Sequence, residues 1–433
     1  MREMPYRQIH LDFHTSPFIG EVGRKFDAEK FAKTLKNAKV ESVNVFAKCH
    51  HGMCYYPTKI GKMHPGLKFD LLGEMINACH QEGIKAPVYF PTGWEENAAE
   101  HADWLEVDAD GVLGGKQPFE SGYYRWRKLC HNKEEYIRYI LGQTEELLDL
   151  YDVDGFWYDI VRQDQCVCGD CRAEMERLGL DPGDIRDVRK HDFIVIERFI
   201  NRVYTFVKER KPDASVYFNM SLDPDGGFER DFSIKKKIRY MTHLEIESLP
   251  SGEWGYNHFP LYVNFHNHSG MQVVGMTGKF HKSWGDFGSL KNKAALEYEC
   301  FRMIANGAKC CIGDQLHPSG ELDATVYRRV GEVYGRIESV EHLCRNTEKI
   351  AEIGILSANS PLEKDSLPDE GAMRMLLELH RPFDLVDRYD GFDGYSIMIL
   401  PDKIIFDDEL ANKINRYLEN GGAVIASYRS GMD

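Results

Sequence analysis

Hydrophobic and polar positions mark out eight short β-rich runs in the first three quarters of the chain, and the segments between them have helical periodicity. The runs are RQIHLDFH (7–14), ESVNVFAK (41–48), IKAPVYFPTGW (84–94), VDGFWYDIV (153–161), SVYFNMS (215–221), MTHLEIES (241–248), QVVGMTGKF (272–280) and AKCCIGDQLH (308–317). FDLLGEMINACHQEG is an example of an intervening amphipathic stretch. Strand and helix alternating eight times predicts an α/β fold, a (β/α)8 TIM barrel.

A second alternation begins near residue 349. KIAEIGILSA, FDLVD, YSIMILPD and AVIASY are typical of strands, with the helical segment DDELANKINRYLENGG before the last of them. This pattern predicts a smaller doubly wound, flavodoxin-like α/β domain. We therefore expect a catalytic barrel over residues 1–347 and a second domain over 348–433, apparently incomplete because residue 433 follows directly after a strand.

Chemistry in a TIM barrel gathers at the carboxyl ends of its strands. In this chain those ends and the loops after them contain His14, Lys48, His50, His51, Tyr89, Trp94, Asp159, Asn219, Glu245, Glu247, His281, Trp284, Asp314, Gln315 and His317. Carboxylates supply acid, base and nucleophile, imidazoles bind hydroxyl groups, and aromatic faces stack on sugar rings. The set suits carbohydrate better than phosphate or a nicotinamide, because the sequence has neither an Arg cluster nor a GxGxxG motif after the first strand.

Three carboxylates stand out as catalytic candidates. Asp159 ends the buried run GFWYD, whereas Glu245 and Glu247 alternate with Leu244 and Ile246 and so share one face of their strand. Two neighbouring carboxylates raise one pKa, as a general acid requires at neutral pH. Spacing does not choose between the two glutamates, and the distance from Asp159 would distinguish a retaining from an inverting glycosidase.

His50 and His51 are adjacent, and adjacent residues of a strand point to opposite faces. We expect the strand to have ended before them, so that a loop aims both imidazoles at the substrate.

Cys166, Cys168 and Cys171 form a C-x-C-x-x-C motif, and Cys130 is the candidate fourth ligand. Four thiolates predict a closed structural zinc site. The remaining cysteines are scattered and are expected to be packed as free thiols.

Net charge and composition exclude some partners. The 433 residues carry a formal charge of −15, which disfavours nucleic acid and anionic membrane surfaces. Eleven cysteines, the absence of a signal segment in MREMPYRQIHLDFH and the absence of a run of about 18 apolar residues favour a cytoplasmic protein.

Several long segments resemble glycoside hydrolase family 151, an α-L-fucosidase family, and the related hypothetical glycosyl hydrolases. They are RQIHLDFHTS, FAKCHHGMCYYPT, EIESLPSGEWGY, GMTGKFHKSWGDFG and GDQLHPSG. AKCHHGMCYYPT also resembles the paired-histidine segment of family 29 fucosidases. The resemblance implies a retaining exo-α-L-fucosidase with a covalent glycosyl-enzyme intermediate, which releases fucose from a fucosylated oligosaccharide or glycoside without a catalytic cofactor. By this resemblance Asp159 is the nucleophile and Glu245 or Glu247 the acid/base. The implied substrate-binding residues are His14, His50, His51, Tyr89, Trp94, His281, Trp284 and Gln315.

The cysteine pattern and the second domain resemble the zinc site and the trimerisation domain of family 42 β-galactosidases, which implies a homo-oligomer. The chain departs from that family at WYDIV, where an Asn-Glu pair would carry the acid/base. Two alternatives stay open: another exo-glycosidase, such as a galactosidase, on the same scaffold, and a non-catalytic sugar-binding protein. A metal-dependent hydrolase with histidine ligands is disfavoured, because neither H-x-H nor H-E-x-x-H occurs near His50.

Overall fold

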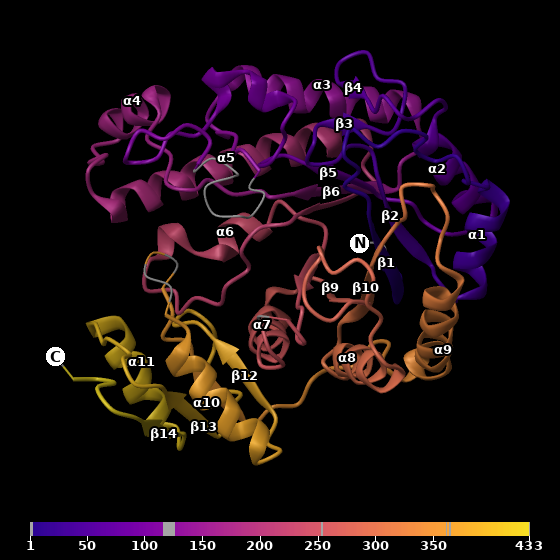
Figure 1. Cartoon of the computed structure of the whole chain (residues 1–433). Coiled ribbons are helices and arrows are strands. Elements are labelled where there is room, and N and C mark those ends of the chain that lie inside the picture. Colours follow the sequence, from indigo (N-terminus) through magenta and orange to yellow (C-terminus); the bar gives the residue numbers. More distant parts are fainter. Residues whose placement is uncertain (1–2, 116–125, 253, 361, 363–364, 433) are drawn as a thin grey trace.

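Eight parallel strands form the barrel, as predicted (Figure 1). The computed structural model describes residues 3–115, 126–252, 254–360, 362 and 365–432. The strands are β1 (Arg7–Asp12), β2 (Ser42–Phe46), β5 (Val88–Pro91), β6 (Gly155–Asp159), β7 (Ser215–Phe218), β8 (Leu244–Glu247), β9 (Val273–Gly278) and β10 (Lys309–Gln315). Their order is β7-β6-β5-β2-β1-β10-β9-β8, so β7 and β8 are the outer strands of a nearly closed barrel. The backbone N–H of Thr242, just before β8, donates to Val216 O of β7 at 3.0 Å, so one hydrogen bond connects the two outer strands.

Helices cover the outside of the strands (Figure 1). They are α1 (Ala28–Asn37), α2 (Leu71–Gln81), α3 (Glu134–Leu150), α4 (Gly169–Arg177), α5 (Ile185–Arg210), α6 (Ile234–Ile238), α7 (His258–His266), α8 (Lys293–Ala305) and α9 (Ala324–Val340). Aspartates cap several of them: the side chain of Asp27 accepts from Lys30 N, and that of Asp70 from Gly73 N. Two short strands, β3 (Met53–Cys54) and β4 (Lys62–Met63), pair within the loop after β2.

Stacked aromatic side chains fill the barrel below its mouth. The rings of Phe46 and Tyr89 stack with centroids 3.6 Å apart, and Trp157 continues the stack from Tyr89 at 5.6 Å. Tyr217 lies 5.5 Å from Trp157. These close contacts make a rigid floor beneath the strand ends, so the polar side chains above it are held in place.

The second domain is a parallel sheet of β11 (Ile353–Leu356), β12 (Phe383–Val386), β13 (Ile397–Leu400) and β14 (Ala423–Ala426), with helices α10 (Leu367–Glu378) and α11 (Asp408–Glu419). Its order, β12-β11-β13-β14, is the start of the flavodoxin-like order, as predicted. The predicted boundary at residue 347 falls between α9 and β11 and stays a prediction.

The two parts of the chain are packed together. Asn359 donates to the carbonyl of Pro224 at 2.6 Å, and the ammonium of Lys349 donates to the side-chain oxygen of Asn264 on α7. Side chains of the second domain, Ile355 and Phe383 among them, belong to the same buried apolar cluster as the barrel.

The structure pairs none of the eleven cysteines in a disulfide, and ten of them are buried. Among the described helices, none combines the length and the apolar character that a membrane span requires.

Candidate active site

Asp159 ends β6 and lies at the centre of a hydrogen-bond network at the barrel mouth. The carboxylate is 7% exposed. Its Oδ2 accepts from the hydroxyl of Tyr89 at 2.5 Å, and its Oδ1 accepts from the amide of Asn219 at 2.9 Å. His50 Nε2 lies 3.6 Å from Oδ2. Hydrogen-bond donors thus hold both oxygens of this carboxylate.

The backbone turns sharply after Asp159. Ile160 has φ +54°, a conformation that a β-branched residue rarely adopts. Thr92 holds the turn, because its backbone N–H and its hydroxyl both donate to the carbonyl of Asp159, at 2.9 and 3.1 Å. A Cβ at Gly93 would lie 2.1 Å from the carbonyl oxygen of Ile160, so only glycine fits beside the turn. The strained backbone at Ile160 changes the direction of the chain directly after Asp159, at the barrel mouth.

Glu247, at the end of β8, faces Asp159 across Asn219. The same Asn219 Nδ2 that binds Asp159 donates to Glu247 Oε2 at 3.3 Å, and the indole of Trp284 donates to Glu247 Oε1 at 2.7 Å. Burial raises the pKa of Glu247 to about 7 and the Asp159 carboxylate adds to the rise, against the opposing hydrogen bond from Trp284. This carboxyl group therefore exchanges its proton near neutral pH.

Glu245 shares a face with Glu247 but lies deeper in the barrel, with 3% exposure. Its Oε1 pairs with His243 Nε2 at 3.0 Å, and its Oε2 has no hydrogen-bond partner. The structure thus separates two carboxylates that the sequence could not distinguish: one at the mouth and one below it.

Three histidines line the other side of Asp159. The rings of His14 and His50 are stacked at 4.0 Å. His14 Nδ1 accepts from the backbone N–H of His50 at 3.1 Å, and His14 Nε2 lies 3.1 Å from Asp12, so this ring carries its proton on Nε2. Burial lowers the pKa of His50 well below its usual value and that of His51 to about 4. Both are neutral imidazoles at pH 7.

His50 and His51 lie in a turn after β2 has ended, as expected. Two tryptophans flank them. Trp94 meets His50 edge-on at 5.3 Å, and Trp126 lies 4.6 Å from His51, also edge-on. The result is an aromatic wall beside Asp159.

Three predicted substrate-binding residues take other positions. Tyr89 is buried beneath Asp159 and bonds to it. Gln315 donates to the backbone carbonyl of Trp284 at 2.7 Å and so supports the loop that carries the indole. His281 is exposed, and the contacts described for it are those of its backbone N–H with Asp286 and Ser289.

Two central residues are missing from the predicted catalytic and substrate-binding set, although Asn219 was among the polar residues noted at strand ends. Asn219 joins the two carboxylates, and Trp126 completes the aromatic wall. The position of Asn219 directly after the run SVYF of β7 was the signal available for it.

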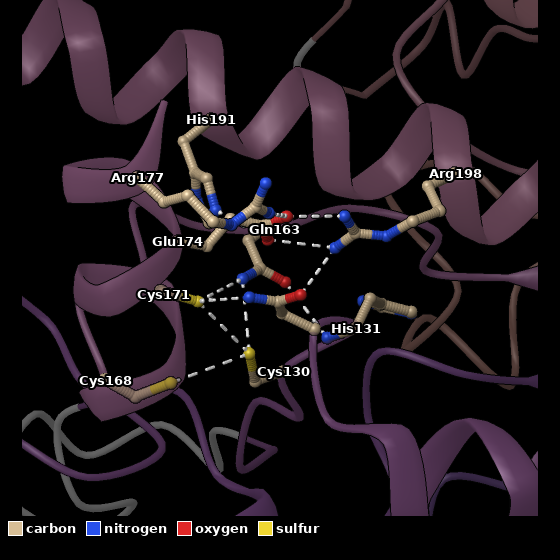
Figure 2. A network of polar contacts seen from close by, with 10 residues as sticks. Cys130, His131, Gln163, Cys168, Cys171, Glu174, Arg177, His191 and Arg198 are labelled. Atoms are coloured by element: carbon tan, nitrogen blue, oxygen red, sulfur yellow. Dashed lines mark hydrogen bonds and ion pairs between the residues drawn. The ribbon is translucent and has the colours of Figure 1, made fainter. Parts of the chain in front are cut away.

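Cys130, Cys166, Cys168 and Cys171 come together, as their spacing predicted. Their sulfurs lie within 4.8 Å of one another. Cys130 Sγ is 3.9 Å from Cys168 Sγ and 3.6 Å from Cys171 Sγ, and Figure 2 shows these three residues. All four are buried. The hydrogen bond from Cys130 lowers the pKa of Cys168, so the cluster already favours a thiolate. Four buried sulfurs this close together match the ligand set of a tetrahedral metal ion.

A chain of hydrogen bonds runs from this cluster to Asp159. The amide of Gln163 donates to Cys130 and Cys171 at 3.3 and 3.4 Å, and its oxygen accepts from His131 N at 3.0 Å (Figure 2). His131 Nε2 lies 3.2 Å from the hydroxyl of Thr92, which holds the Asp159 carbonyl. The cysteine cluster thereby supports the loop after β6.

Comparisons with known proteins bear on the family and on the fold of both parts of the chain. Residues 27–160 match the family described as Hypothetical glycosyl hydrolase 6, and residues 373–433 match the β-galactosidase trimerisation domain. α-L-Fucosidase isoenzyme 2 from Paenibacillus thiaminolyticus is 38% identical, with a TM-score of 0.92. That alignment covers 99% of this chain but 65% of the fucosidase, so the chain spans about two thirds of its relative's length.

The β-galactosidases from Rahnella sp. R3 and from Bacillus circulans sp. alkalophilus share the fold at 14% identity, with TM-scores of 0.75 and 0.74. Each alignment covers 98% of this chain and 71% of the galactosidase. No curated protein sequence matches the chain.

Fold and site define a (β/α)8 barrel protein with opposed carboxylates at its mouth and a β-galactosidase-type second domain. The chain belongs to the family of hypothetical glycosyl hydrolases, and the resemblance inferred from its motifs is confirmed at that level.

Proposed function

We propose that this protein is a glycosidase, a retaining exo-α-L-fucosidase that works through a covalent glycosyl-enzyme intermediate. The observation that carries the proposal is the single amide of Asn219 that binds Asp159 at 2.9 Å and Glu247 at 3.3 Å. Because both bonds come from Asn219 Nδ2, Asp159 Oδ1 and Glu247 Oε2 can be no farther apart than the sum of these two distances. That limit is below the ~6.5–9.5 Å of inverting enzymes and close to the ~5–5.5 Å of retaining ones.

Asp159 is the proposed nucleophile. Hydrogen bonds from Tyr89 and Asn219 orient its two oxygens, and the turn at Ile160 fixes its direction. Its carboxylate attacks the anomeric carbon and forms an ester as the bond to the leaving oxygen breaks.

Glu247 is the proposed acid/base, in preference to Glu245. A carboxyl group with a pKa of about 7 is protonated often enough to give its proton to the leaving oxygen. As a carboxylate it then takes a proton from water, whose oxygen attacks the anomeric carbon. The ester breaks, Asp159 is released, and Glu247 has regained its proton.

Neutral His50 and His51 are the proposed ligands of the sugar hydroxyls, with Trp94, Trp126 and His14 around them. A neutral imidazole both donates and accepts a hydrogen bond, which suits a hydroxyl group. The sugar is proposed to be L-fucose because a solved structure 38% identical to this chain bears the name α-L-fucosidase.

We also propose a structural zinc ion on the four cysteines, which leaves no open position for catalysis. The match to a trimerisation domain supports a homo-oligomer, and eleven cysteines without a disulfide support a cytoplasmic location. Mass measurement in solution would test the oligomer.

Hydrolysis of 4-nitrophenyl α-L-fucoside by the wild type, Asp159→Gly, Glu247→Gln and Glu245→Gln tests the assignment. We expect turnover by the wild type, a loss of several orders of magnitude in Asp159→Gly, and rescue of that variant by azide as fucosyl azide. Glu245→Gln is the matched control for Glu247→Gln, since the two residues share a strand and a chemistry; a larger loss in Glu245→Gln would reverse their roles. Turnover of a galactoside in place of the fucoside would keep the mechanism and replace the sugar, whereas binding without any turnover would indicate a sugar-binding protein.

A further inference from the structure

A cavity of about 800 Å³ opens on the far side of the two carboxylates from the histidines. Its lining begins at Asn219, Glu245 and Glu247 and continues over the loops after β6 and β7 to residues of α5, α6 and α7. Figure 1 shows where these elements lie. Asp159, His50 and Trp94 are not among the described residues that line it. The cavity therefore lies beyond the bond that the proposed mechanism cleaves, where the leaving group of the substrate must sit.

A ladder of aromatic rings runs along one wall of this cavity. Trp254 lies 5.0 Å from His258, and His258 stacks on Tyr262 at 4.0 Å. Trp254 is 42% exposed, so its ring presents a free face at the entrance. His258 is tied to the end of β8, because its Nδ1 lies 2.6 Å from the hydroxyl of Ser248, the residue after Glu247. Tyr262 donates to Asp223 in the loop after β7. The wall is thus fixed relative to Glu247.

The basic side chains of the cavity are already engaged. Arg162 pairs with Asp164 at 3.3 Å and lies over Trp94. Arg189 donates to the carbonyl of Leu362, and Lys237 lies over the ring of Phe193 at 4.5 Å. Carboxyl groups outnumber these cations in the described lining. A wall of aromatics with fixed polar groups and no available cation suits a neutral polyhydroxylated ligand better than an anionic one.

We propose that this cavity is the aglycone subsite and that the substrate is a neutral fucosylated oligosaccharide, whose sugar next to fucose stacks on Trp254, His258 and Tyr262. The inference rests on the proposed function, since it names what Glu247 releases. It goes further by selecting an oligosaccharide over a small or anionic aglycone.

The test compares two substrates that differ only on the leaving side. α-L-Fucosyl fluoride has a one-atom leaving group, whereas mono-fucosylated lactose or N-acetyllactosamine fills the cavity. Trp254→Ala should lower the ratio of kcat/KM on the oligosaccharide to kcat/KM on the fluoride by about ten-fold, the size expected for one aromatic contact. Trp254→Phe should restore most of the ratio, and Tyr298→Ala, an exposed aromatic on α8 outside the cavity, should leave it at the wild-type value. An unchanged ratio in Trp254→Ala would overturn the proposal.

A binding experiment separates this proposal from the proposed function. Lactose and N-acetyllactosamine, the defucosylated products, should bind the wild-type protein in calorimetric titrations and bind Trp254→Ala about ten-fold more weakly. The predicted difference in binding does not depend on catalysis. A protein that hydrolyses no fucoside but shows this difference would contradict the proposed activity and leave the proposed subsite standing. Equal binding by both proteins would defeat the subsite, and tighter binding of sulfated than of unmodified lactose would defeat its neutral character.

Discussion

Replacing Trp284 with phenylalanine should move the alkaline limb of the pH–activity profile to higher pH. The indole N–H donates to Glu247 Oε1 at 2.7 Å, and this bond favours the carboxylate. Phenylalanine keeps an aromatic ring but has no donor, so the pKa of Glu247 must rise from its value of about 7.

The size of the rise follows from the strength of the bond. A hydrogen bond to a charged group contributes ~1.5–3 kcal/mol net, and one pKa unit corresponds to ~1.4 kcal/mol. Since Trp284 is only half-buried, water replaces part of the lost bond, and we expect a shift of about one unit. Glu247 must be protonated in the first step, so activity falls as pH rises through its pKa. A higher pKa therefore extends activity to higher pH.

The assay is kcat/KM for phenyl α-L-fucoside as a function of pH, because phenol is a leaving group that needs a proton and kcat/KM reports the free enzyme. Tyr298→Phe, on the exposed face of α8, is the control and should leave both limbs in place. A movement of the acidic limb instead would mean that Glu247 acts ionised in the first step. An unmoved alkaline limb would mean that another group supplies the proton.

Three further changes test the supports of the site. Lys48→Met removes the cation that lies 2.5 Å from buried Glu95 and should lower the free energy of unfolding in urea by ~3–5 kcal/mol. The double variant Lys48→Met/Glu95→Gln should recover part of that loss, and an unchanged urea midpoint in Lys48→Met would contradict the prediction. Cys171→Ser should abolish the zinc that elemental analysis finds in the wild type, one ion per chain, and lower Tm; a wild type without metal would refute the zinc site. Gly93→Ala places a Cβ 2.1 Å from Ile160 O and should reduce kcat ~100-fold by displacing Asp159, whereas Gly335→Ala on α9 meets nothing within 4 Å and should be silent; equal kcat in both would show that the turn tolerates the methyl group.

Much of the barrel was predictable because its signals are local. All eight strands fall within the β-rich runs, since burial on both faces of a parallel sheet demands continuous apolar residues whatever their partners. Asp159 was found for the same reason: it is the polar residue at the end of such a run. The loop position of His50 and His51 followed from the two-residue period of a strand.

Other features depend on distances that a sequence does not contain. Cys130 lies far from Cys166 along the chain, so the motif spacing could not include it and its part in the cluster was a hypothesis; only the fold brings the loops before α3 and after β6 together. His281 belongs to a segment rich in site-like residues, but its side chain is exposed, whereas Trp284, three residues on, reaches Glu247.

By itself, the sequence determined the fold class, the strand ends and the shared face of Glu245 and Glu247, because the periods of strands and helices are properties of the local backbone. Only the tertiary structure decided which glutamate meets Asp159. Closing the barrel sets Glu245 against His243 in the interior, whereas it brings Glu247 to Asn219 and Trp284 at the mouth. That choice rests on the relative depth of residues from neighbouring strands, and depth is a property of the closed barrel.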